Sequence, residues 1–215
     1  MSEDDVAVAM KPYVIAIAGP SCSGKTSVAK SLAAELPATI FSLDAYYHDL
    51  SQLSFSERAA FNFDHPDSLE VEILSRDLHL LAQGREVVRP VYDFHTHTRS
   101  GKTETLNPSP YLIVEGLFTL YWESIREIYS TKVFMEADHE TCLPRREARD
   151  IAERGRSPES IHQQYAATVR PMADQFVMPT RQYADLILSG SQPVEESAAA
   201  VLAHVRSVER SSNRR

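Results

Sequence analysis

The stretch Tyr13–Ser27 reads YVIAIAGPSCSGKTS, and it decides the fold class of this chain. Its second part, Gly19–Thr26, matches the pattern G-x-x-x-x-G-K-[ST], in which backbone N–H groups surround phosphate oxygens. An apolar run precedes this loop, and the helix-compatible stretch Ser27–Leu36 follows it. The alternative is a chance match in a loop rich in glycine and serine, which would require neither the apolar run before it nor the helix-compatible stretch after it. Strand, loop and helix in this order predict a binding site for a nucleoside triphosphate at the start of a helix.

Each residue type in the loop suits this chemistry. Gly19 and Gly24 let the backbone curl so that consecutive N–H groups point at phosphate oxygens. Lys25 brings a positive charge to the outer phosphates, and the hydroxyl of Thr26 can ligate Mg²⁺. The side chain of Cys22 is expected to be a small filler that points away from the phosphates. We expect the phosphate donor to contact Gly19, Ser21, Cys22, Ser23, Gly24, Lys25, Thr26 and Ser27.

Length and composition fit one globular domain. The chain has 215 residues, of which 43% are hydrophobic, enough for a single buried core. Its formal net charge of −8 makes it a poor candidate for nonspecific nucleic-acid binding. Its two cysteines form no disulfide framework, its N-terminus lacks the basic start of a secretory signal, and no apolar run approaches the roughly 18 residues that span a bilayer. We therefore expect a reduced, cytoplasmic protein that binds neither nucleic acid nor membrane.

Apolar runs that are typical of strands alternate with helix-like stretches along the chain. Strands are predicted at 13–18, 39–43, 111–114, 132–135 and 186–188, and helices at 25–36, 67–83, 139–153, 157–177 and after Pro193. This alternation predicts the α/β class of P-loop NTPases, a parallel sheet with helices on both faces. Ligands of such sheets bind beyond the carboxyl ends of the strands.

Three segments stand apart from this alternation. Residues 1–11 are predicted to be a loose tail, and the aromatic and polar residues 45–66 are predicted to be a loop that faces the substrate. Residues 85–107 alternate in a strand-like way and are predicted to form an inserted β-hairpin with its turn at Ser100-Gly101.

Two carboxylates, Asp44 and Glu115, follow predicted strands at the same edge of the sheet as the phosphate loop. Carboxylates there can hold Mg²⁺, often through its waters. One of them could also accept a proton from an attacking hydroxyl. The alternative is that Asp44 caps a helix and that Glu115 is a solvated turn residue. The phosphate loop favours the functional interpretation, with Thr26, Asp44 and Glu115 as the metal site.

A cluster of arginines follows in a short stretch of this acidic chain, namely Arg145, Arg146, Arg149, Arg154 and Arg156. Arg146 and Arg149 are three residues apart, so they share a helix face. With Gly155 as a hinge, residues 142–160 fit a mobile lid that closes on the transferring phosphate. The alternative is a solvated helix in which Glu147, Asp150 and Glu153 pair with the arginines.

His95 and His97 form an H-x-H pattern on a predicted strand, which would place both rings on one face. A metal site would need further ligands at suitable spacing, and the sequence offers none. A substrate contact and an ordinary surface histidine both fit the pattern better than a metal ligand.

Several longer motifs resemble those of the uridine/cytidine kinase family. They are Asn62–Asp67 (NFDHPD), Tyr92–Arg99 (YDFHTHTR), Glu115-Gly116, Arg146–Arg156 (REARDIAERGR), Gln164-Tyr165 and Pro179–Asp185 (PTRQYAD). The resemblance runs from about Tyr13 to Leu188, nearly the whole chain. The phosphate loop alone is shared with many proteins, but the NFDHP and YDF motifs together are much narrower.

This resemblance implies a kinase that uses ATP with Mg²⁺ to phosphorylate the 5′-hydroxyl of uridine and cytidine. It implies Asp44 as the base, acting with Lys25 and Arg149 in catalysis, and it adds Arg154 near the phosphates. The implied nucleoside contacts are Tyr47, Asp64, Tyr92, His97, Arg146, Arg156 and Gln164. It also implies a homo-oligomer, either a tetramer or a dimer.

The chain departs from the family at two places. Leu188–Pro193 reads LSGSQP where relatives tend to carry a basic and an acidic residue near the adenine, so the choice between ATP and GTP as donor stays open. His95 replaces a smaller residue common in the YDF motif. Two other functions compete with the nucleoside kinase: a phosphoribulokinase-like kinase of another small alcohol, and a GTP-dependent switch. The switch would need an N-K-x-D motif, and the three asparagines are followed by Phe, Pro and Arg.

Overall fold

Five parallel strands form the central sheet, in the order β2-β5-β1-β6-β7. They are β1 (Tyr13–Ala18), β2 (Ala38–Ser42), β5 (Tyr111–Glu115), β6 (Thr131–Glu136) and β7 (Leu186–Ser189). This computed structural model describes residues 11–212, so nearly all of the tail predicted at residues 1–11 lies outside the described residues. Each strand lies within two residues of its predicted position, and the predicted parallel sheet is confirmed.

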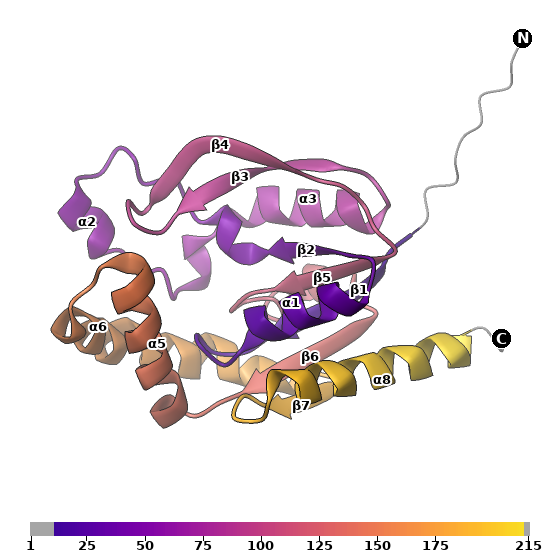
Figure 1. Cartoon of the computed structure of the whole chain (residues 1–215). Coiled ribbons are helices and arrows are strands. Elements are labelled where there is room, and N and C mark those ends of the chain that lie inside the picture. Colours follow the sequence, from indigo (N-terminus) through magenta and orange to yellow (C-terminus); the bar gives the residue numbers. More distant parts are fainter. Residues whose placement is uncertain (1–10, 213–215) are drawn as a thin grey trace, which may run out of the picture.

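Helices cover both faces of this sheet because the strand side chains alternate between two hydrophobic clusters. Ile15 and Ile17 of β1 pack with α1 (Lys25–Glu35) and α8 (Val194–Ser212). Val14 and Ala16 point the other way, into a cluster that includes the apolar face of α3 (Val71–Ala82). Figure 1 shows α1 and α8 side by side along the sheet. The predicted layers are therefore confirmed.

The predicted hairpin is present, but its turn is not where the sequence placed it. Strands β3 (Val87–Asp93) and β4 (Thr98–Leu106) pair antiparallel, with Asp93 opposite Thr98. The turn therefore lies at residues 94–97, and Ser100-Gly101 lies inside β4. The carboxylate of Asp93 accepts bonds from the His95 N–H and the Thr96 hydroxyl, each at 2.9 Å. Such bonds stabilise a turn directly after an aspartate.

The position of the turn corrects the prediction for the two histidines. His95 and His97 lie in the turn rather than on a strand, so they do not share a strand face. His97 adopts a left-handed backbone with φ of 55°. Its ring is thereby turned towards Phe63, on which it stacks at 5.0 Å between ring centroids.

The remaining helices are α2 (Phe55–Ala59), α4 (Glu123–Arg126), α5 (His139–Arg154), α6 (Pro158–Gln164) and α7 (Arg170–Met172). The helix predicted at 157–177 is helical throughout, but π-helical turns at Tyr165–Val169 and Ala173–Val177 flank α7. Among residues 11–212, no helix is both long enough and apolar enough to cross a bilayer.

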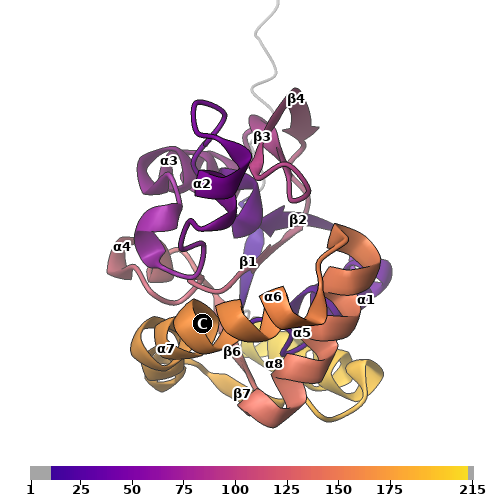
Figure 2. The same ribbon diagram turned by 90° about the vertical axis from the view of Figure 1, so that its left-hand side faces the viewer.

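One end of the molecule gathers the segments that follow the strands. On the left of Figure 1, α2 and the β3–β4 turn lie above α5 and α6. Figure 2 looks onto this end, with the hairpin and α2 on one side and α5 and α6 on the other. The parallel strands bring the phosphate loop, Asp44 and Glu115 to this same edge, as expected for a ligand site.

Candidate active site

Three residues of the phosphate loop have positive φ angles, which residues other than glycine rarely adopt. Gly19 has φ of 140°, and a Cβ atom there would lie 2.3 Å from the carbonyl oxygen of Met135. Cys22 and Gly24 have φ values of 65° and 101°, and the Ser23 N–H donates to the Pro20 carbonyl at 3.2 Å. Helix α1 begins at the next residue, Lys25. Left-handed residues in such a loop turn successive N–H groups inward and make a concave site for anions.

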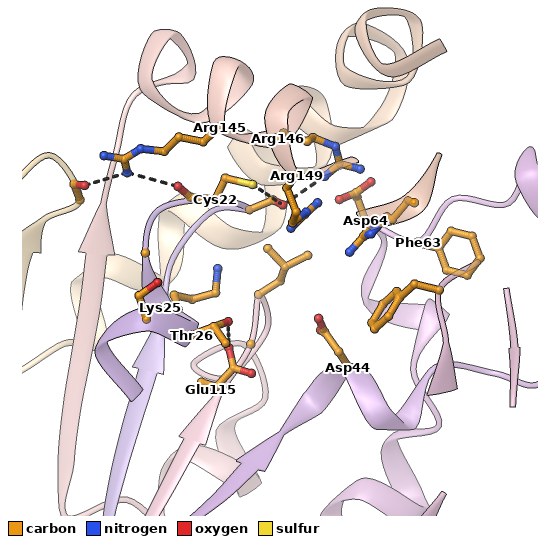
Figure 3. A pocket seen from close by; sticks show the side chains of 18 of the residues that line it. Cys22, Lys25, Thr26, Asp44, Phe63, Asp64, Glu115, Arg145, Arg146 and Arg149 are labelled. Carbon is orange, nitrogen blue, oxygen red and sulfur yellow. Dashed lines mark hydrogen bonds between the residues drawn. The ribbon is translucent and has the colours of Figure 1, made fainter. Parts of the chain in front are cut away.

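Lys25 and Thr26 point into this end of the pocket (Figure 3). Lys25 is only 7% exposed, and its Nζ donates to the Pro20 carbonyl at 2.7 Å. Burial lowers the pKa of Lys25, against the opposing effect of the charges on Glu115 and Asp44. The Thr26 hydroxyl donates to Glu115 Oε2 at 3.0 Å. The lysine therefore bonds to a carbonyl of the phosphate loop itself.

Asp44 does not cap a helix, and Glu115 is not a solvated turn residue, so both structural alternatives are wrong. Ser42, not Asp44, is the N-cap of the 3₁₀ turn Leu43–Tyr46, and Glu115 is only 5% exposed. Burial and, after it, the charge of Glu115 raise the pKa of Asp44 to about 6, against the lowering effects of Lys25, Arg154 and Arg149. Two mutually repelling carboxylates beside one hydroxyl form a set of oxygen ligands that suits a divalent cation.

These ligands suit a magnesium ion that binds together with phosphate groups better than a metal ion that is coordinated by protein side chains alone. Within residues 11–212, no three side chains of His, Cys, Asp or Glu come together as a metal site. Mg²⁺ usually keeps several waters and takes one or two carboxylates plus phosphate oxygens. Asp44 and Glu115 would be the two carboxylates of such a site, and the Thr26 hydroxyl would be a further oxygen ligand.

Helix α5 aims its arginines at the phosphate loop from the opposite wall (Figure 3). Arg145 donates to the Gly190 carbonyl at 2.8 Å. Arg146 donates to the Ser21 hydroxyl at 3.1 Å and to Gln164 Oε1 at 3.1 Å. Arg156 donates to the same oxygen of Gln164. The arginines therefore connect the phosphate loop, the loop after β7 and helix α6.

One buried carboxylate, Asp150, lies within 4.0 Å of four guanidinium groups. Its Oδ1 lies 2.8 Å from Arg149 Nη2 and 3.5 Å from Arg154 Nη1. Its Oδ2 lies 3.5 Å from Arg146 Nε and 3.7 Å from Arg156 Nη1. The alternative of acidic partners on this helix thus holds for Asp150, but the paired arginines line the pocket instead of facing solvent.

The wall that lies away from the phosphate loop is aromatic. Tyr47 packs against Phe63 at 5.4 Å and Tyr92 at 5.3 Å between ring centroids, and His97 stacks on Phe63. The guanidinium of Arg154 lies 4.7 Å above the ring of Phe94. Burial lowers the pKa of His97, and the charges of Arg156, Arg154 and Arg58 add to this effect, so the neutral imidazole is favoured. Flat neutral rings here suit a planar ligand.

Asp64 lies beside this wall with a carboxylate oxygen that lacks a partner. The side chain is 6% exposed, and its Oδ2 is buried without a hydrogen bond from any described residue. Burial raises the pKa of Asp64, while Arg146, Arg149 and Arg154 oppose this effect. The turn itself is braced by its neighbours: Asn62 Oδ1 accepts from the Asp64 N–H, and His65 Nδ1 accepts from the Asp67 N–H. A buried acceptor left free in this way suits a ligand hydroxyl.

Together these walls enclose a cavity of about 400 Å³. All but two of the predicted site residues line it, namely Ser21, Cys22, Gly24, Lys25, Thr26, Ser27, Asp44, Tyr47, Asp64, Tyr92, His97, Glu115, Arg146, Arg149, Arg154, Arg156 and Gln164. Gly19 and Ser23 lie behind the loop surface, and Ser23 is fully buried. The sequence interpretation assigned no role to other lining residues, Phe63, Phe94, Gly116, Leu117, Arg145, Gly190, Gln192 and Val194.

A sequence signal existed for some of the missed residues. Phe63 and Phe94 belong to the NFDHP and YDF motifs, and Arg145 belongs to the arginine cluster. Gly190 and Gln192 come from the loop after β7, which carries no recognisable motif, and Val194 is the first residue of α8. Gly190 lies so close to the phosphate loop that a Cβ atom would come within 2.6 Å of the Ser23 carbonyl oxygen.

Comparison with known proteins decides the family. The model of the phosphoribulokinase/uridine kinase family matches residues 14–196. The chain belongs to this family. The resemblance of the sequence motifs is thereby confirmed.

Curated family members are similar over most of the chain. A uridine kinase of Chloroflexus aurantiacus is 45% identical over 182 residues, 83% of this chain and 87% of the relative. A uridine kinase of Lactobacillus johnsonii is 40% identical over 202 residues, 92% of this chain and 96% of the relative.

Solved structures of other kinases share the fold at low sequence identity. A phosphoribulokinase from Rhodobacter spheroides has a TM-score of 0.62 at 16% identity, over 86% of this chain and 74% of that one. A D-glycerate 3-kinase from Cryptococcus neoformans has a TM-score of 0.60 at 16% identity, over 85% and 88% of the two chains. At these identities the likeness concerns the fold, and it supports the predicted class of P-loop kinases.

Proposed function

We propose that this family member is a uridine–cytidine kinase, which transfers the γ-phosphoryl group of ATP to the 5′-hydroxyl of uridine or cytidine to give UMP or CMP. The observation that carries the proposal is the aromatic wall with the unbonded Oδ2 of Asp64, set opposite a phosphate loop in one cavity. The relatives at 40–45% identity are named uridine kinases, which supports uridine as a substrate.

The acceptor end suits a pyrimidine nucleoside. The rings of Tyr92 and His97 would border the base, with Tyr47 beside the sugar. Asp64 is an acceptor and Arg146 a donor, so together they match a vicinal diol that can donate to one and accept from the other. Arg156 and Gln164 already share a hydrogen bond and would complete the nucleoside contacts.

The donor end suits a nucleoside triphosphate. The loop N–H groups and Lys25 would hold the phosphates, and Lys25 would exchange its bond to Pro20 for a phosphate oxygen. Mg²⁺ bound with the donor would neutralise phosphate charge, with Thr26, Asp44 and Glu115 holding it directly or through waters. The base of the donor, ATP or GTP, would lie near the loop after β7 and the start of α8, where Gln192 and Val194 line the cavity.

Asp44 is proposed as the general base, with Lys25 and Arg149 stabilising charge. A carboxylate whose pKa is raised to about 6 is ionised at neutral pH and is a stronger proton acceptor than an ordinary aspartate. It would accept the proton of the 5′-hydroxyl as that oxygen attacks. Arg149 and Arg154 would meet the charge on the transferring group, which is the main catalytic task in phosphoryl transfer.

The proposal extends to the organisation of the protein. We infer one kinase domain over residues 1–215, in which 85–107 form a hairpin insertion and 142–160 act as a lid. The arginines of α5 and Gly155 at its end support a lid of this extent. We further infer a cytoplasmic homo-oligomer, a dimer or a tetramer, as in the family that the motifs resemble.

A phosphoribulokinase-like activity is the nearest competing function, since the family includes it. A sugar phosphate offers no flat ring, so the stack of His97 on Phe63 and the packing of Tyr47 on Tyr92 would have no partner. A regulatory GTP-binding role lacks an N-K-x-D motif in this chain. The aromatic wall therefore favours the nucleoside.

The experiment is a coupled assay of ADP release with ATP and Mg²⁺ over a panel of uridine, cytidine, adenosine, guanosine and ribulose 5-phosphate. We expect turnover with both pyrimidine nucleosides and poor turnover with purines, which are too large for the pocket beside Tyr92 and His97. Comparable rates with a purine nucleoside would refute the pocket. Slow ATP hydrolysis at a rate that no added acceptor changes would favour the regulatory role instead.

A further inference from the structure

Asp150 is fully buried, and its carboxylate contacts four arginines that line the cavity. Its two oxygens divide those arginines. Oδ1 accepts from Arg149 Nε at 2.9 Å and lies 3.5 Å from Arg154. Oδ2 lies 3.5 Å from Arg146 and 3.7 Å from Arg156. One carboxylate thus faces the two arginines proposed for the phosphates with one oxygen and the two proposed for the nucleoside with the other.

The end of α5 is shaped so that this arrangement forms. Arg146 and Arg154 lie one turn before and one turn after Asp150, so helix geometry brings them to the same face. Arg156 lies beyond the helix and returns because Gly155 adopts a left-handed φ of 62°. The N–H groups of Gly155 and Arg156 both donate to the Asp150 carbonyl. The backbone and the side chain of Asp150 therefore both hold Arg156.

The charge balance explains why the arginines need this carboxylate. The four guanidinium groups carry a charge of +4 against −1 on Asp150. The charges of Asp44 and Asp64 also act on them, but the guanidinium groups still repel one another in a partly buried site. Burial lowers the pKa of Arg154, the charge of Arg149 lowers it further, and Asp150 opposes both. Without the carboxylate the arginines would separate and regain rotamer freedom, which each ligand would have to remove again.

We propose that Asp150 is a positioning residue for phosphoryl transfer, which presets the phosphate arginines through Oδ1 and the nucleoside arginines through Oδ2. It contacts no reacting atom and acts through the four guanidinium groups. This inference rests on the proposed function, because that function gives the two pairs their ligands. It adds a residue that links the donor end of the site to the acceptor end.

Kinetics of Asp150→Asn test the inference, with Glu153→Gln as the matched control. Glu153 lies exposed on the same helix, so its amide variant should behave as the wild type. The amide keeps an acceptor for Arg149 but loses the negative charge and places an NH2 donor beside Arg146 and Arg156. The kcat/KM for uridine should therefore fall about 10- to 150-fold, the range for losing a charged partner. In an Arg149→Ala background, the same substitution should cost clearly less kcat/KM than in the wild type, because the bond to Oδ1 is gone and only the contacts with the other three arginines remain. A merely structural role gives the full loss in that background and would overturn the proposal, as would wild-type kinetics for Asp150→Asn.

Two further measurements keep the inference testable if the variant unfolds or if uridine is not the substrate. In the wild-type protein, the Nε proton of Arg149 should exchange with water far more slowly than that of Arg170, whose side chain is 62% exposed. Equal exchange rates would overturn the proposal without any variant. If the wild type leaves uridine unphosphorylated, the proposed function fails, and Asp150 is judged by the binding of a nonhydrolysable ATP analogue with Mg²⁺. That binding should weaken at least about 10-fold in Asp150→Asn, and unchanged affinity would contradict the inference.

Discussion

Replacing Asp44 with asparagine should make the protein more stable while nearly abolishing its activity. The substitution keeps the size of the side chain but removes its charge and its ability to accept a proton. Removing a general base costs at least about 10²-fold in turnover. Nucleoside affinity should change less, because Asp64 and Arg146 are the proposed sugar contacts.

The gain in stability follows from the pKa of Asp44. The pKa of this carboxyl rises from its ordinary 3.8 to about 6 in the folded protein, mainly through burial. At about 1.4 kcal/mol per pKa unit, ionising this group costs the folded state about 3 kcal/mol at pH 8. The carboxylate still opens onto the pocket, so we expect water to reduce this to about 1–2 kcal/mol. For a chain of this length, that is a rise in Tm of about 2–8 °C.

The sign of the effect depends on pH. A raised carboxyl pKa destabilises the folded protein once the group ionises, so the penalty is absent below pH of about 4 and complete above pH of about 6. Thermal unfolding of wild type and Asp44→Asn at pH 8 and pH 4 should therefore show a gain that disappears in acid. The exposed Glu72 on α3 supplies the control Glu72→Gln, with no gain at either pH. Turnover within about 3-fold of wild type, or a lower Tm at pH 8, would refute the reasoning.

Three further outcomes follow from the same site. The kcat/KM of the wild type for uridine should fall as pH drops through about 6, because Asp44 of the free protein is then protonated, and a profile flat down to pH 5 would contradict this. Arg149→Ala should lower kcat more than it raises the KM of uridine, and the reverse pattern would make Arg149 a substrate-positioning residue. 2′-Deoxycytidine should be about 10- to 150-fold poorer than cytidine in kcat/KM. Asp64→Ala should shrink that gap, and an unchanged ratio would show that Asp64 does not read the 2′-hydroxyl.

The sequence was sufficient for the fold because its signals are local. The apolar run Tyr13–Ala18, the glycines of the loop and the helix after Lys25 act over a few residues, and the structure has them at those positions. Asp44 and Glu115 followed from one rule, that the carboxyl ends of parallel strands share an edge.

Competing local interactions and tertiary packing account for what the sequence did not reveal. Asp93 forms a turn with its own carboxylate, so the hairpin reverses before Ser100-Gly101 and carries both histidines out of the strands. Glu147, Asp150 and Glu153 all lie near arginines in sequence, but only packing decides which of them turns inward. Asp150 is fully buried, whereas Glu153 is exposed. The rotation of α5 about its axis sets that difference, and it depends on contacts with α6.

The central claim is that the cavity transfers a phosphoryl group from a nucleoside triphosphate to the 5′-oxygen of uridine. The most direct test incubates the protein with γ-labelled ATP, Mg²⁺ and uridine, and then identifies the labelled product. We predict label in 5′-UMP, none in the absence of uridine beyond slow hydrolysis, and loss of transfer in Asp44→Asn. Label that appears only as inorganic phosphate, at a rate that uridine does not change, would contradict the account.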